Sequence, residues 1–165
     1  MLHSGRVLDP FDRVSEVIFG VLMAMTFIGA MNVATAGREE VRTIMIAALG
    51  CNVAWGLTDA VMYLVGIITE RTREKTRPRL NGRDFKGALG IFLLVTVSTF
   101  PLVVPFMFLR ELGPALAASR LIAVVMLFFS GWVLARHAGG STWLAGFAMA
   151  AIGAALTGAL MALGG

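Results

Sequence analysis

One aspartate lies deep inside an apolar stretch of the sequence, and side chains able to bind a metal ion stand at helical spacing around it. Asp59 is the single charged residue between positions 43 and 69. Asn52 precedes it by seven residues and Met62 follows it by three, so on a helix these three residues share a face. A carboxylate, an amide oxygen and a thioether suit a divalent transition metal. The pattern predicts a metal site. The alternative is an aspartate that only hydrogen-bonds to Asn or Tyr on a neighbouring helix.

Two further candidates stand in the preceding apolar stretch. Glu16 and Met23 are seven residues apart, which places them on one helical face. Glu16 is interpreted either as a carboxylate at the membrane entrance or as a first-turn acid favoured by the helix dipole. Met23 is interpreted either as a soft metal ligand or as a side chain that fills the core. The predicted metal ligands are therefore Asp59, Met62, Asn52, Glu16 and Met23.

The elements that position these residues are expected to be membrane-spanning helices. Hydrophobic residues make up 58% of the 165 residues, charged residues make up 15%, and the mean hydropathy is +0.82. The apolar residues form blocks of about 20 or more, which a soluble fold of this size could not bury. A soluble enzyme, a nucleic-acid-binding domain and a disulfide scaffold are excluded, and Cys51 is the only cysteine. We expect an all-α, polytopic membrane protein with a single transmembrane domain over residues 1–165 and a first span that is kept rather than cleaved as a signal peptide. The five expected helices cover about 14–36, 42–68, 87–109, 114–136 and 142–163.

The distribution of basic residues predicts the orientation of these helices. If five spans alternate in direction, ten of the fourteen Lys and Arg residues fall on the side of the N-terminus. Basic residues gather on the cytoplasmic side of membrane proteins. We therefore expect a cytoplasmic N-terminus, a basic cytoplasmic loop over 70–86 and a C-terminus outside. That loop is interpreted as a topological anchor rather than as a site for anionic lipid or nucleic acid.

Three features predict how the helices pack. Pro101 and Pro105 should bend the third span, with Ser98 and Thr99 placed to satisfy the freed carbonyl groups. Small residues every four positions in the last span predict a packing seam. That stripe consists of Gly146, Ala150, Ala154, Gly158 and Ala162. Arg120, near the outer end of the fourth span, is expected to extend its side chain toward the interface.

Three stretches of the chain resemble the vacuolar iron transporter family of five-helix membrane proteins. EVIFGVLMAMTFIGAM resembles the first helix of the family with its Phe-Gly turn, TFPLVVPFMF the third helix with its prolines, and GFAMAAIGAALTGALMALGG the last helix. The resemblance implies a homodimer that exports Fe(II) or Mn(II) from the cytosol in exchange for protons. It also implies an ion path between the first and second helices at the dimer interface.

The chain departs from this family at two places. The aspartate of the family's first helix corresponds to Met23 here, and 17 mostly basic residues replace the glutamate-rich metal-binding module between the second and third helices. The resemblance leaves Asp59 and Met62, in TDAVMYL, as the acid and thioether of the second helix. The resulting expectation is a divergent member of the family, either with altered selectivity or no longer transporting iron.

The first functional hypothesis is a proton-coupled exporter of iron or manganese. Its expected partners are the lipid bilayer, the metal ion, protons and a second copy of the chain. The alternative is a non-transporting membrane subunit or anchor in which Asp59 only supports helix packing. The sequence contains no hydrolase triad, phosphate loop or enzymatic His/Glu metal cluster. We therefore expect no enzymatic activity, no bound cofactor and no nucleic-acid partner.

Overall fold

A computed structural model describes residue 8 and residues 10–29, 38–74, 79–109 and 111–162. Apart from short connections these residues are helical, and none of them forms a strand. The elements are α1 (Pro10–Gly29), α2 (Arg38–Arg73), α3 (Gly82–Ser98), α4 (Phe100–Phe108), α5 (Leu112–Ala138) and α6 (Thr142–Ala162). The expected all-α class is confirmed.

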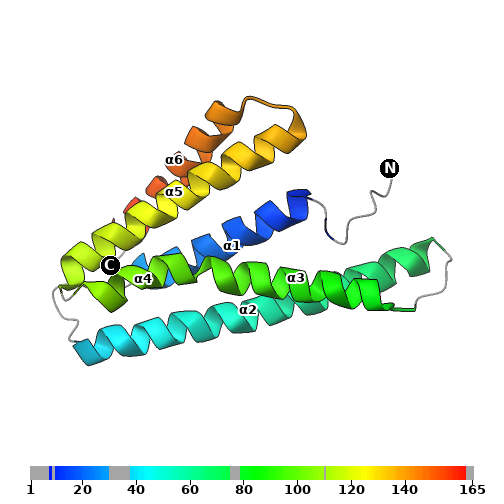
Figure 1. The fold of residues 1–165 in the computed structure, drawn as a ribbon, viewed down its shortest axis with the longest axis horizontal. Helices are drawn as coiled ribbons and strands as arrows, with labels where there is room; N and C mark the ends of the chain where they lie inside the picture. Colours follow the sequence, from blue (N-terminus) through cyan, green and yellow to red (C-terminus); the bar gives the residue numbers. More distant parts are fainter. Residues whose placement is uncertain (1–7, 9, 30–37, 75–78, 110, 163–165) are drawn as a thin grey trace.

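The described helices have the length and composition of membrane spans. Within these residues, four helical stretches are long and apolar enough to cross a bilayer: Met45–Arg73, Gly82–Phe108, Leu112–Ala138 and Thr142–Ala159. The fifth helix, α1, has 20 residues, which corresponds to about 30 Å. It carries three charged residues near its start, Asp12, Arg13 and Glu16, and runs alongside the others (Figure 1). The protein is a multi-pass membrane protein.

Helix α1 is the central element of the bundle. Figure 1 shows it between two helical hairpins, one made of α2 with α3 and α4, the other of α5 and α6. Its buried side chains belong to one apolar core with residues of α4 and α5. That core consists of Val21, Ala24, Met25, Ile28, Leu102, Leu116, Ala123 and Leu127. Helix α1 is therefore packed against both hairpins.

Several helix boundaries differ from those expected. Helix α2 extends beyond 42–68 at both ends, and α3 begins at Gly82 rather than at 87. Residues 70–73 and 82–86 of the expected loop are therefore helical. The cause is local, because Asn81 caps α3 by accepting hydrogen bonds from the backbone N–H groups of Arg83 and Asp84, each at 3.0 Å. The fourth and fifth expected spans agree with α5 and α6, whereas the expected positions 30–36 and 163 lie outside the described residues.

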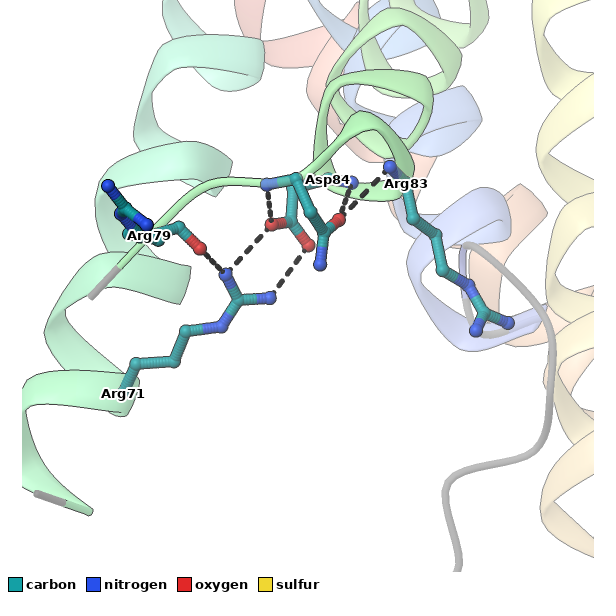
Figure 2. Close-up of polar contacts among 5 residues, drawn as sticks. Arg71, Arg79, Arg83 and Asp84 are labelled. Atoms are coloured by element: carbon teal, nitrogen blue, oxygen red, sulfur yellow. Dashed lines mark hydrogen bonds and ion pairs between the residues drawn. The ribbon is translucent and has the colours of Figure 1, made fainter. Parts of the chain in front are cut away.

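An ion pair joins the adjacent ends of α2 and α3 (Figure 2). Arg71 donates from Nη2 to Asp84 Oδ1 at 2.9 Å, and its Nη1 lies 2.9 Å from Asp84 Oδ2. Arg71 Nη1 also donates to the carbonyl oxygen of Arg79, and the backbone N–H of Asn81 donates to Asp84 Oδ2 at 2.8 Å. We call Arg71, Asn81 and Asp84 the α2–α3 clasp. Part of the basic segment thus holds two helices together.

The expected bend in the third span is a break between two helices. Helix α3 ends at Ser98 and α4 begins at Phe100, one residue before Pro101. The Ser98 hydroxyl donates to the carbonyl oxygen of Val95 at 2.8 Å, and the Thr99 hydroxyl donates to that of Thr96 at 2.9 Å. Both hydroxyl groups therefore bind carbonyl oxygens beside the break, but not the carbonyl of Val97, which is the one that Pro101 leaves without its helical partner.

The predicted small-residue seam is only half correct. Gly146 packs against Phe128 of α5, with 2.8 Å between an added Cβ and the nearest ring atom, but Ala154, Gly158 and Ala162 are exposed. Contact with Leu127 is made instead by Gly153, seven residues after Gly146. A spacing of four rotates by about 40° per step on a helix with 3.6 residues per turn, whereas a spacing of seven stays on one face. Residues at a spacing of four from Gly146 therefore turn away from the contact between α5 and α6 along the helix.

Candidate functional site

The predicted ligand Asn52 lies where α1, α2 and the α3–α4 break meet. Its side chain is fully buried, with 0% exposed. Its Nδ2 donates to the carbonyl oxygen of Gly20 at 3.2 Å and to the hydroxyl of Thr99 at 2.5 Å. Its other polar atom, Oδ1, is buried and has no hydrogen-bond partner. Asn52 therefore joins three helical segments through its nitrogen and keeps an oxygen available.

Gly20 allows α1 to approach closely enough for this contact. A Cβ atom at Gly20 would lie 2.6 Å from the backbone oxygen of Val95 and would also collide with the hydroxyl of Ser98. No side chain fits there without moving α1 away from α3. Glu16 stands one turn before Gly20, on the same face of α1. The glycine thus fixes how near Glu16 lies to the other two helices.

Asp59 lies two turns beyond Asn52 on the same face of α2. Its Oδ2 atom is buried and has no hydrogen-bond partner. Because α1 and α2 run in opposite directions (Figure 1), Glu16, one turn before Gly20, lies on the same side of the Asn52–Gly20 contact as Asp59, two turns beyond Asn52. The negative charge of Asp59 acts on the Glu16 carboxylate. Two acids that are far apart in the sequence therefore lie in the same region between α1 and α2.

Thr96 supplies another oxygen to this region from α3. Its Oγ1 atom is buried without a hydrogen-bond partner. It faces Gly56, where an added Cβ would lie 3.1 Å from Thr96 Oγ1 and 3.1 Å from the backbone oxygen of Phe92. Gly56 stands between Asn52 and Asp59 on the face that these residues share. We call the following residues the polar cluster: Glu16, Asn52, Asp59, Thr96 and Thr99.

The two predicted methionine ligands have different surroundings. Met23 is half-buried on α1, one turn beyond Gly20. Met62 is 60% exposed on the outer side of α2, so a single chain does not enclose its sulfur within the polar cluster. The structure places Asn52 and Asp59 on the face of α2 toward α1 and Glu16 within reach of the Asp59 charge, whereas a role for either methionine stays a prediction.

Two members of the cluster are not among the residues that the sequence singled out as ligands. The sequence assigns Thr99 only to the support of the proline break, and it assigns no role to Thr96. Both stand in the polar run TVST inside an apolar span, and that run is the signal that could have identified them. Which of these hydroxyl groups faces α2 depends on the rotation of α3, which the sequence of α3 does not specify.

Arg120 is a second ionisable residue within the spans, and it lies apart from the polar cluster. Its Nε atom is buried without a hydrogen-bond partner, and the side chain borders a narrow space with Met25, Ile28, Ser119 and Thr157. Part of its guanidinium is therefore held inside the bundle, which differs from the expected extension toward the interface.

The chemistry of the polar cluster is that of oxygen ligands. It offers carboxylate, amide and hydroxyl oxygens, and three of these atoms, on Asn52, Asp59 and Thr96, are buried without partners. No group of three or more His, Cys, Asp or Glu side chains that could hold a metal ion occurs in the described part of the chain. Oxygen donors of this kind suit hard or borderline divalent cations. A search of protein-family models and a search of curated proteins both find no match to this chain.

Proposed function

We propose that this protein carries a divalent metal ion, iron or manganese, out of the cytosol across a membrane in exchange for protons. The observation that supports the proposal is the set of buried, unpartnered oxygens on Asn52, Asp59 and Thr96 among membrane-spanning helices. An unsatisfied polar group in the hydrocarbon region costs several kcal/mol. Ionisable groups at such positions are typical of ion and proton pathways.

The carboxylates of Glu16 and Asp59 suggest how a cation and a proton would exchange. Two negative charges within reach of each other favour the binding of a divalent cation between them. When the cation leaves, a proton on either carboxylate removes the same repulsion. Either carboxylate therefore serves as a metal ligand in one state and as a proton carrier in the other. Alternate binding of a cation and a proton at the same groups is what an antiporter requires.

The alternative function, a non-transporting subunit or anchor, requires a different hydrogen-bonding pattern at Asp59. A residue kept for helix packing would use its carboxylate oxygens as hydrogen-bond acceptors. Asp59 Oδ2 accepts no hydrogen bond, and the link between helices is made by Asn52 with Gly20 and Thr99. This division of roles favours the transporter.

The proposed orientation places the N-terminus and the α2–α3 connection in the cytoplasm and the C-terminus outside. It is supported by the ten Lys and Arg residues on that side against four on the other. A reporter that is active only in the cytoplasm, fused after the last residue, should be inactive. Activity of that fusion would reverse the direction of transport that we propose.

A homodimer with α1 and α2 at the interface is part of the same proposal. Helix α1 is central within one chain, and the side that we propose for the interface carries Phe19 (37% exposed), which packs edge-on against Trp55 of α2 with 6.0 Å between ring centroids. A second copy on this side would also cover Met62. Single cysteines at Phe19 in a Cys51→Ala background should cross-link in the membrane, and cysteines at Leu144 of α6 (71% exposed) should not.

The decisive experiment replaces Asp59 with asparagine, which keeps the shape of the side chain but removes its charge and its proton. We expect Asp59→Asn to fold as the wild type does, yet to lose metal-stimulated proton movement in proteoliposomes that contain a pH-sensitive dye. Glu111→Gln, the same change at an exposed residue beside α5, is the matched control and should keep the wild-type rate.

Transport by Asp59→Asn at the wild-type rate with unchanged pH dependence would overturn the proposal. Equal losses in Asp59→Asn and Glu111→Gln would also contradict it, because the effect would then follow from net charge rather than from the polar cluster. Iron(II), manganese(II) and calcium(II) should be compared in the same assay, since the oxygen donors and the candidate thioethers favour different ions.

A further inference from the structure

A groove on the outside of the bundle runs between the start of α1 and one face of α3. It has a volume of about 400 Å³ and lies apart from the polar cluster. Residues of α3 line it at helical spacing, beginning with Lys86 and Gly90 and ending with Leu93, Leu94 and Val97. These positions follow each other as i, i+4, i+7, i+8 and i+11, so they form one continuous face of the helix.

One end of this groove is cationic. Arg13 of α1 and Lys86 of α3 line it, and both side chains are exposed. Among the described residues neither forms an ion pair, and none of the groove-lining residues is acidic. Positive charges from two different helices thus line the same groove, near the starts of α1 and α3.

The rest of the groove is apolar and has the length of one membrane leaflet. Leu93 and Val97 are 47% and 56% exposed, and Val97, 11 residues after Lys86, lies about 17 Å further along the helix. This is roughly half of the ~30 Å hydrocarbon core. Leu8 closes the inner side of the groove because Gly90 leaves room for it; an added Cβ at Gly90 would lie 2.9 Å from Leu8 Cδ1.

We propose that this groove binds one anionic phospholipid from the leaflet at this end of the bundle. Its phosphate lies between Arg13 and Lys86, and one acyl chain lies along Leu93, Leu94 and Val97. The two cations complement an anionic headgroup, and the apolar wall excludes water from the chain. An extended peptide or a nucleic acid does not fit the apolar section, because its polar backbone would meet hydrocarbon.

The test is the affinity of the purified full-length protein for single lipids, measured by native mass spectrometry in detergent. We expect phosphatidylglycerol to bind more tightly than phosphatidylcholine with the same acyl chains. In the double variant Arg13→Gln with Lys86→Gln, phosphatidylglycerol should bind about thirtyfold more weakly, since each basic residue near an anionic lipid contributes roughly 1 kcal/mol.

Matched variants separate a binding groove from general attraction to a basic surface. Arg73→Gln with Arg79→Gln removes two exposed charges at the same end of the bundle but outside the groove, and it should keep wild-type affinity. Val97→Trp should fill the groove and weaken binding, whereas Leu89→Trp, at an equally exposed position of α3 (56%) outside the groove, should not.

Four results would overturn the proposal. The first is equal affinity for the two lipids, and the second is an equal loss of phosphatidylglycerol affinity in the Arg73 and Arg79 double variant. The third is the same affinity in Val97→Trp and Leu89→Trp. The fourth is displacement of phosphatidylglycerol by glycerol phosphate at the concentration at which the intact lipid displaces it. The last result would assign recognition to a soluble phosphate instead of a lipid. None of these measurements depends on transport, so the lipid site and the proposed function can fail separately.

Discussion

The α2–α3 clasp and the polar cluster are both built from polar side chains at helix contacts, but they use hydrogen-bonding capacity in opposite ways. In the clasp both carboxylate oxygens of Asp84 accept hydrogen bonds, and Asn81 Oδ1 accepts two more (Figure 2). In the polar cluster three oxygens, on Asn52, Asp59 and Thr96, are buried and accept none.

This difference separates a polar network that stabilises the fold from one that can bind a ligand. Buried polar groups in native proteins are nearly always paired, and each exception calls for a reason. In the α2–α3 clasp both oxygens of the Asp84 carboxylate are already paired, so neither is available to bind a ligand. In the polar cluster, hydrogen-bond acceptors stay buried and unpaired, which costs free energy. This is the expected property of a binding site.

The largest effect is expected when the cluster is pushed apart while the clasp stays intact. Gly20→Leu would place side-chain atoms against Ser98 and the Val95 carbonyl oxygen and force α1 away from α3. We expect a loss of about 3 kcal/mol in the free energy of unfolding and loss of metal-stimulated proton movement. Gly50→Leu is the control, because an added Cβ there meets nothing within 4 Å. Unfolding of both variants by denaturant in detergent micelles would show the difference, and equal stabilities would refute the close approach.

The next effect comes from breaking the clasp while leaving the cluster intact. Asp84→Ala removes the ion pair with Arg71 and the hydrogen bond from the Asn81 N–H. Because Asp84 is buried and Arg71 is partly exposed, we expect a loss of about 2 kcal/mol, measured as a lower unfolding midpoint in the same denaturant series. Transport per folded molecule should be unchanged.

Glu74→Ala, at an exposed position beside the clasp, is the control and should have little effect on stability. A transport defect in folded Asp84→Ala would mean that the clasp and the polar cluster are not independent.

The smallest effect distinguishes two threonines of the cluster. Thr99→Val removes a hydroxyl that accepts from Asn52 and donates to a backbone carbonyl, and it should cost about 1 kcal/mol. Thr96→Val removes an unpartnered hydroxyl and should leave stability unchanged or slightly higher. Thr96→Val should nevertheless weaken metal binding, measured by titration calorimetry with manganese(II). A clear loss of stability in Thr96→Val would show that its oxygen is paired after all.

Much of the fold could be predicted from the sequence because the membrane imposes simple rules. Long apolar blocks identify the helices, and Pro101 identifies the break between α3 and α4. Helical spacing also places Asn52 and Asp59 on one face of α2, and Glu16 and Gly20 on one face of α1. These predictions depend only on residues within one helix, where the geometry is known in advance.

Relations between helices could not be predicted in the same way. Nothing within α3 indicates that Thr96 faces α2, and nothing within α6 indicates that Gly153 rather than Ala154 contacts α5. Both depend on how neighbouring helices rotate and cross, which is decided by packing across the whole bundle. The early start of α3 is different, because the NGRD segment carries a capping box that the sequence displays.

The hydrogen bond between Asn52 and Thr99 has a mechanical consequence. Thr99 stands at the break between α3 and α4, so the Asn52 amide ties this break to α2. An ion that drew the Asn52 side chain toward itself would break this hydrogen bond and free the Thr99 hydroxyl. Reciprocity of coupled equilibria then requires that loss of the hydrogen bond alters the affinity for the ion by the same factor.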